Sequence, residues 1–241
     1  VIAATADLEL EYLSMDNDSQ DLLLGTLRLA TDVYVPVSTT DPNRHPVVLW
    51  AGAVIGDESI ALIEEATLAT REVIDNVEFV VVARADQADR LKADVTERDL
   101  PVTVASISDV EPLVDLIERS WACVTVPDRG FPHGLAMLAL SAGVPLISVG
   151  ELEEKHGFKN HLNFLEVDPD DHQAVAYNLQ LIRHWTTWGL RIGIAGQRLV
   201  EERYSTRTVA LREGEQLARI AKGEEISPAV DSAMKVLKEF L

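Results

Sequence analysis

The sequence predicts a doubly wound α/β fold, in which helices cover both faces of a parallel sheet. Between residues 46 and 205, short apolar runs alternate with segments of helical periodicity. The apolar runs are continuous, which is typical of strands that are buried on both faces. Strands that alternate with helices form right-handed β-α-β crossovers, so we expect about six parallel strands in the order 3-2-1-4-5-6.

The strands and helices of this domain follow one another regularly along the chain. The predicted strands are the apolar runs at residues 47–53, 77–83, 102–105, 122–126, 144–149 and 162–167. The predicted helices between them cover residues 57–75, 86–95, 109–119 and 132–142. For the first helix Asp57 is a candidate N-cap, and the candidate inward-facing side chains are Ile60, Ile63, Leu68 and Val73.

The C-terminal part of the sequence has only helical patterns, at residues 171–187, 190–202, 206–221 and 227–240. We expect residues 171–202 to leave the sheet. Trp185 and Trp188 are three residues apart, which indicates one helix face, and we expect this face to be partly uncovered in the chain and to pack against another domain or helix.

The N-terminal part has a helical stripe at residues 6–15 and a short strand pattern at residues 32–37. Residues 38–46 are rich in Pro, Ser, Thr and Asn, which favours a domain boundary. We therefore interpret residues 1–45 as a linker or the end of a preceding domain, 46–205 as the α/β domain and 206–241 as a helical extension. The chain begins at Val1 and not at Met, which is compatible with a fragment of a longer protein.

Composition excludes several kinds of partner. The 241 residues carry a formal net charge of −19, with 40 acidic against 21 basic residues. Such a surface repels nucleic acid and anionic lipid. No apolar run approaches the roughly 18 residues that cross a bilayer. We therefore expect no nucleic acid partner, no membrane span and a cytoplasmic location.

Cysteine and histidine usage argues against redox and metal chemistry. The single cysteine, Cys123, lies in an apolar run, so we expect a buried packing role and a reducing compartment. His156, His161 and His172 lack metal-ligand spacing with it, and we expect no metal. The pair Glu153-Glu154 is typical of a solvated face.

Ligands of open α/β sheets bind at the carboxyl ends of the strands, which selects four short segments. The first strand is followed by Gly52 and Ala53, the second by Arg84 and the third by Ser106. The segment after the fourth strand, residues 127–134, is the most informative.

In that segment Gly130 allows the backbone to approach a ligand closely, and Pro132 suits the first turn of a helix. The N–H groups of this helix would point at the mouth of the sheet, where they favour a diphosphate. A plain β-α turn explains the same residues equally well.

The run at residues 111–150 resembles the donor-domain core of the retaining GT-B glycosyltransferases of family 4 (group 1). In that family a strand that ends in Pro leads to a Gly-Phe-Gly or Gly-Phe-Pro turn, and the next helix ends in small-x-Gly-Val-Pro. This sequence has Val126-Pro127, Gly130-Phe131-Pro132 and Ala142-Gly143-Val144-Pro145 in the same order.

Two further stretches, residues 1–5 (VIAAT) and 202–205 (ERYS), are similar to family signatures near the two ends. The resemblance implies a Rossmann-like donor domain that binds a nucleoside-diphosphate sugar as substrate, without a cofactor. The sugar would pass to an acceptor that an N-terminal domain or partner chain holds.

The sequence departs from the family at the charged positions. A basic residue usually follows the glycine after the first strand, where Ala53 stands here, and a Lys usually comes a few residues later, within what is here 55–57. The family's paired glutamates flank the Gly-Phe turn and the following helix. Here Arg129 stands near the first, and Met137 or Leu138 near the second, which normally holds the donor ribose.

Three side chains are candidates to take over the roles of the charged residues that this sequence lacks. Arg84 and Arg129 are placed to pair with phosphate, and His133 to contact the sugar or the diphosphate. A surface ion pair of Arg129, an exposed turn position for His133, and packing of Arg84 over the helix at residues 86–95 are the structural alternatives.

The sequence therefore supports two functional hypotheses. In the first, the chain is the donor domain of a glycosyltransferase; in the second, it is a catalytically degenerate relative that serves binding or assembly. The predicted nucleotide-sugar site comprises Gly52, Ala53, Arg84, Ser106, Arg129, Gly130, Phe131, Pro132, His133, Gly134 and Leu135.

Overall fold

The computed structural model describes residues 47–52, 56–83, 85–106, 110–127 and 130–205, together with Thr208 and Leu211. The elements expected at residues 6–15, 32–37, 206–221 and 227–240 therefore lie outside the described residues, apart from Thr208 and Leu211.

The chain divides into two compact units, residues 33–200 and residues 1–32 with 201–241. In the second unit the described residues include a local turn, in which the Thr208 N–H donates to Ser205 Oγ at 3.3 Å.

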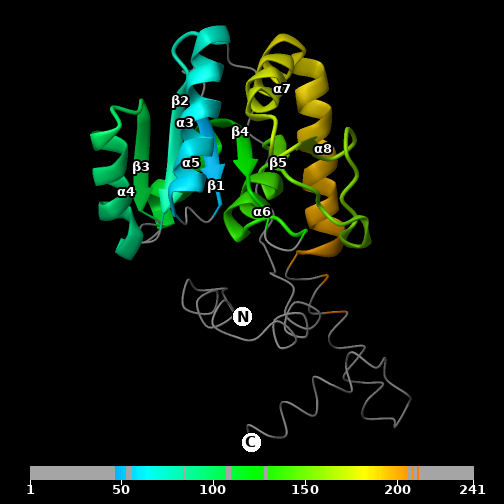
Figure 1. Cartoon of the computed structure of the whole chain (residues 1–241). Coiled ribbons are helices and arrows are strands. Elements are labelled where there is room, and N and C mark those ends of the chain that lie inside the picture. The colour runs from blue at the N-terminus through cyan, green and yellow to red at the C-terminus, as the bar shows by residue number, and fades with distance from the viewer. Residues whose placement is uncertain are drawn as a thin grey trace, which may run out of the picture. The chain divides into compact units, whose positions relative to one another are not determined.

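A six-stranded parallel sheet forms the centre of the first unit (Figure 1). The strands are β1 (Val47–Ala51), β2 (Glu78–Ala83), β3 (Val102–Ser106), β4 (Ser120–Thr125), β5 (Leu146–Val149) and β6 (Leu165–Val167). Their order is β3-β2-β1-β4-β5-β6, and every neighbouring pair is parallel. The predicted fold class and strand order are confirmed.

The helices begin and end within a few residues of their predicted bounds. They are α3 (Gly56–Val73), α4 (Ala85–Glu97), α5 (Val110–Arg119), α6 (Gly134–Ser141), α7 (His172–His184) and α8 (Thr186–Arg203), with a short 3-10 helix η1 (Glu154–His156). In Figure 1, α4 lies beside β3 at one edge of the sheet, and α7 and α8 lie at the other end.

The central strands are buried on both faces, as their continuous apolar runs predict. Every residue of β1 is buried, including Trp50. Val48 and Trp50 of β1 pack in one apolar cluster with Val124 of β4 and residues of α3, α4 and α7. Cys123 has the predicted packing role: it is fully buried, and burial raises the pKa of its thiol well above the ordinary value.

Helix α3 corrects two side-chain assignments. Ile60 and Ile63 are buried as expected, but Leu68 and Val73 are 48% and 46% exposed. The inward face advances by three or four residues per step, and it continues through Thr70 to Ile74. Leu68 and Val73 lie off this stripe, so the prediction for both was wrong. The helix also starts one residue before Asp57, which places Asp57 in the first turn and not at the cap.

Helix α7 corrects the expectation that residues 171–202 leave the sheet. Val175, Leu179 and Ile182 belong to the same core cluster as α3, and α7 contacts β4, β5 and β6. Asp171 caps its start, where the carboxylate accepts the Ala174 N–H at 3.1 Å. Because these apolar positions recur at helical spacing, α7 covers the sheet and does not depart from it.

The two tryptophans do not share a helix face. Trp185 ends α7, whereas Trp188 lies in the first turn of α8. Trp185 is 62% exposed, as expected for an uncovered indole, but Trp188 packs partly buried against the core cluster. Only Trp185 of the pair therefore presents a largely uncovered aromatic surface.

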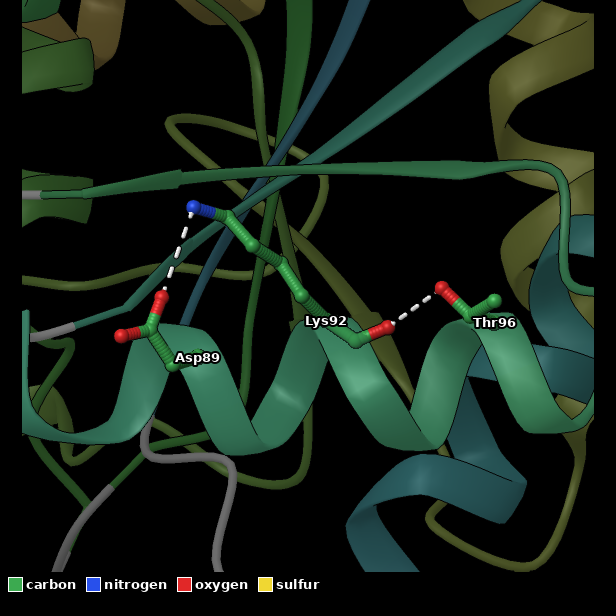
Figure 2. Close-up of polar contacts among 3 residues, drawn as sticks. All are labelled: Asp89, Lys92 and Thr96. Carbon is green, nitrogen blue, oxygen red and sulfur yellow. Dashed lines mark hydrogen bonds and ion pairs between the residues drawn. The ribbon is translucent and has the colours of Figure 1, made fainter.

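Helix α4 divides cleanly between an inward and an outward face. Its inward side chains recur at three- and four-residue steps and are Ala88, Leu91 and Val95. On the outward face, Lys92 Nζ lies 3.9 Å from an Asp89 carboxylate oxygen, and Thr96 Oγ1 donates to the Lys92 carbonyl at 2.7 Å (Figure 2). An exposed pair of this kind contributes about 0–1 kcal/mol, so apolar burial is what holds α4 on β2 and β3.

No helix among the described residues combines the length and the apolar character that a membrane crossing requires.

Candidate functional site

The strand order reverses between β1 and β4, where the loops after the two strands leave in opposite directions. Gly52 follows β1, and a Cβ there would lie 3.3 Å from the Val126 backbone nitrogen. The glycine therefore lets the carboxyl ends of β1 and β4 approach each other closely. This is the position in the sheet at which an open α/β domain forms its ligand crevice.

The loop after β4 is held against the loop after β5. Gly150 has a φ of +117° and packs on the Pro127 ring, and its N–H donates to the Val167 carbonyl at 2.9 Å. Gly130 has a φ of +72°, and its carbonyl accepts the Glu153 N–H at 2.9 Å. A side chain at position 130 would also meet Glu153 Cγ at 2.5 Å, so both φ and space require glycine.

Phe131 anchors this turn through an aromatic chain. Its ring meets the His156 ring edge-on at 5.1 Å and the Phe158 ring at 5.9 Å, and Phe158 continues to Phe164 at 6.0 Å. Phe131 and Phe158 are buried. The buried ring of the predicted site residue Phe131 therefore fixes the turn.

Helix α6 begins two residues later than predicted. Gly134 is its first residue, and His133 is the N-cap, whose Nδ1 accepts the Leu135 N–H at 3.4 Å. Pro132 therefore precedes the cap, where its fixed φ sets the extended approach to the helix. His133 is half-buried in this role, which replaces the alternative of an exposed turn residue.

The cap of His133 makes a testable contribution to stability. We expect His133→Ala to lower the free energy of unfolding by about 1 kcal/mol, because the Leu135 N–H loses its acceptor. His133→Asn restores an N-cap acceptor and should recover most of the loss. Urea unfolding of the three proteins measures both effects. Equal stability of His133→Ala and the wild type would show that the cap contributes nothing.

The sequence interpretation missed Glu153, which it assigned to a solvated face. Glu153 Oε2 forms an ion pair with Lys155 Nζ, and it lies 3.3 Å from His156 Nε2. The Lys155 ammonium beside Oε2 holds the pKa of the Glu153 carboxyl below its ordinary value, although burial acts in the opposite direction. Glu154 is exposed as expected.

The remaining predicted site residues fall into two groups. Ala53, Arg84 and Arg129 lie outside the described residues. Ser106 ends β3, three strands from β4, and strands lie about 4.8 Å apart, so it is roughly 14 Å from the turn. Ser106 and the turn are therefore within reach of one ligand only if that ligand has the length of a nucleotide.

Two side chains near the position of the family's second glutamate lie inside the domain. Met137 is fully buried in the first turns of α6, and Leu138 is partly buried. Neither side chain can accept a hydrogen bond from a ribose hydroxyl. In the part of the chain that the structure describes, no group of three or more His, Cys, Asp or Glu side chains is arranged to hold a metal ion.

Comparisons with known proteins identify the fold. No protein-family model matches the chain, and no curated protein is similar in sequence at a significant level. Among solved structures, the C-terminal domain of a group 1 glycosyl transferase (LpcC) from Francisella tularensis is similar, with a TM-score of 0.57 and 17% identity over 74% of this chain and 99% of that one.

Two longer proteins are similar in the same way. Sucrose-phosphate synthase from Thermosynechococcus elongatus has a TM-score of 0.62 and 20% identity, over 90% of this chain and 62% of that one. HepE from Anabaena, solved with UDP-glucose, has a TM-score of 0.58 and 16% identity, over 73% of this chain and 49% of that one. The chain thus has the fold of a GT-B C-terminal domain, and it spans about half to two thirds of these two longer proteins.

Proposed function

We propose that this chain binds a nucleoside-diphosphate sugar at the carboxyl edge of its sheet and acts as the donor domain of a glycosyltransferase. The observation that carries the proposal is the glycine turn at Gly130, which is held between two loops at the point where the strand order reverses. The turn leads directly into the N-terminus of α6, whose backbone N–H groups and dipole favour a phosphate.

Proteins of the same fold support the identity of the ligand. HepE was solved with UDP-glucose, and the pneumococcal O-GlcNAc transferase GtfA with UDP and GlcNAc. By analogy, the sugar moves to an acceptor that an N-terminal domain or partner chain supplies, since this chain aligns with only part of such proteins. The donor is a substrate, and the proposal requires no cofactor. We place the protein in the cytoplasm, because its single cysteine, Cys123, is a buried free thiol of the kind that a reducing compartment maintains.

The charges that the proposed reaction needs come from few residues. A leaving nucleoside diphosphate must be stabilised by positive charge or by aligned donors. Ala53 replaces the basic residue expected after β1, and His133 uses its Nδ1 to cap α6. In our proposal the diphosphate is therefore bound by backbone N–H groups at the start of α6, by Arg129 and by Arg84.

Titration calorimetry with UDP, GDP and ADP tests the proposal. A charge-assisted contact contributes about 1.5–3 kcal/mol, so the loss of two family contacts weakens binding by roughly two to four decades. We expect a dissociation constant in the high micromolar range or weaker. Arg129→Ala should weaken it further, by about tenfold.

Arg119 offers the matched control. It ends α5 immediately before β4, at the amino end of the strand, and it is exposed. Arg119→Ala removes the same charge at the opposite edge of the sheet and should leave the affinity unchanged. If the chain binds a nucleoside diphosphate tightly and Arg129→Ala does not change the affinity, the binding site lies elsewhere.

The degenerate hypothesis rests on two positions. Ala53 stands where the family has a basic residue, and the buried Met137 stands near the position of the glutamate that holds the donor ribose in the family. Absence of binding to all three nucleoside diphosphates would favour this second function, in which the fold serves binding or assembly.

A further inference from the structure

Glu153 lies against the turn that the proposed donor site is built on. Its N–H donates to the Gly130 carbonyl at 2.9 Å, and its Cγ occupies the space where a side chain at position 130 would stand. Glu153 comes from the loop after β5, and β5 is the direct neighbour of β4. The Gly130 turn belongs to the loop after β4, and the pairing of β4 with β5 brings the Glu153 carboxylate to it from the loop after β5.

The carboxylate has a defined charge and a defined orientation. The ion pair with Lys155 and the contact with His156 both involve Oε2. Oε1 has no ion pair with a described residue, and the side chain remains 40% exposed. Because its pKa is lowered, Glu153 is an anion at neutral pH, and an anionic carboxylate only accepts hydrogen bonds.

Hydroxyl groups are the donors that such an acceptor selects. A sugar carries several hydroxyls, each of which can donate, and a hydrogen bond to a charged acceptor is stronger than one to a neutral acceptor. The nucleoside diphosphate by itself has its free hydroxyls on the ribose, at the other end from the terminal phosphate. In a nucleotide sugar the terminal phosphate carries the sugar. A carboxylate next to the turn that precedes α6 is therefore placed to accept hydrogen bonds from this sugar.

We propose that Glu153 binds the sugar hydroxyls of the donor, so that the site distinguishes a nucleotide sugar from the free nucleoside diphosphate. Glu153 comes from the loop after β5, whereas the position just before the turn holds Arg129. The inference rests on the proposed function and adds a specificity residue to it. A solely mechanical role for Glu153, in which it pins the two loops together, is the competing explanation.

Glu153→Gln separates the two roles. Gln keeps the size of the side chain and the backbone N–H that donates to Gly130, but it lacks the negative charge. The probes are each diphosphate and its own sugar ester: UDP with UDP-glucose and UDP-N-acetylglucosamine, ADP with ADP-glucose, and GDP with GDP-mannose. Calorimetry on the full chain gives, within each set, the ratio of the affinity for each ester to the affinity for its diphosphate.

We expect the wild type to bind at least one ester about tenfold more tightly than its diphosphate, and Glu153→Gln to lose this preference. The affinity for the free diphosphate should stay within about twofold. Glu154→Gln, which removes the neighbouring exposed charge, should retain the preference.

Three outcomes overturn the inference while they leave the proposed function standing. The first is an equal loss of affinity for diphosphate and ester in Glu153→Gln, which would indicate the mechanical role. The second is a wild type that binds the diphosphates but shows no preference for any ester. The third is a Glu153→Gln variant that keeps the ester preference of the wild type. A wild type that binds none of the diphosphates or esters overturns the proposed function itself, and the inference with it.

Discussion

Gly193→Ala is expected to lower the free energy of unfolding by about 3 kcal/mol, although Gly→Ala inside a helix ordinarily gains about 1 kcal/mol. Gly193 lies in the middle of α8, where a Cβ would fall on the Gly143 carbonyl oxygen in the turn after α6. That obstacle is backbone, which cannot rotate away, so α8 would have to move off the domain. Urea unfolding followed by tryptophan fluorescence measures the loss.

Gly189 gives the comparison within the same helix. A Cβ at Gly189 would lie 2.8 Å from Ile182 Cγ2, a side-chain methyl, and 3.4 Å from the nearest backbone atom, the Ile182 carbonyl oxygen. Because the close contact is with one methyl group and not with the backbone, we expect Gly189→Ala to cost less than Gly193→Ala, by about 1 kcal/mol or more. Equal stabilities of Gly193→Ala and the wild type would contradict the close contact between α8 and the turn at Gly143.

Met137→Glu is expected to destabilise the chain by about 3–5 kcal/mol at neutral pH, because it places a carboxylate in a dry apolar site without a partner. Met137 is fully buried, and so are Leu135, Ala136 and Leu140 of the same helix. Burial raises the pKa of the introduced carboxyl in the folded state above its unfolded value. The folded state then binds the proton more tightly, so the deficit should be smaller at about pH 5 than at about pH 8.

Met137→Leu keeps the volume and should cost less than about 1.5 kcal/mol. The variant also bears on function, since the family places a ribose-binding glutamate near this position. A Met137→Glu protein with unchanged stability and increased affinity for UDP would mean that position 137 is open to the ligand. In the structure the side chain at position 137 is instead buried in the interior of the domain.

The fold could be predicted because its determinants are repetitive. Continuous apolar runs such as residues 47–51 occur wherever a strand is buried on both faces, and right-handed crossovers then leave few strand orders. Side-chain assignments within helices were less certain. Leu68 and Val73 are apolar, but the inward stripe of α3 passes through Thr70 and Ile74, and composition alone does not reveal which register the packing selects.

The site could be predicted in part. The Gly130 turn was identified, and the start of α6 was placed within two residues, because glycine and proline mark backbone geometry. The cap of His133 was missed, since histidine is an unusual N-cap and nothing local distinguishes it from a turn residue. Glu153 was missed for a different reason: its partner Gly130 is far away in sequence, and only the pairing of β4 with β5 brings their loops together.

The central claim is that a nucleoside diphosphate binds at the Gly130 turn and the start of α6. Titration of the ¹⁵N-labelled chain with UDP, GDP and ADP, followed by amide chemical shifts, tests the location directly. We predict that for at least one of them the amide signals of Gly52, Gly130, Gly134 and Leu135 shift together with one dissociation constant. The claim would be contradicted if the signals of these four amides stayed unchanged and the shifted signals belonged instead to residues on the exposed faces of α3 and α7.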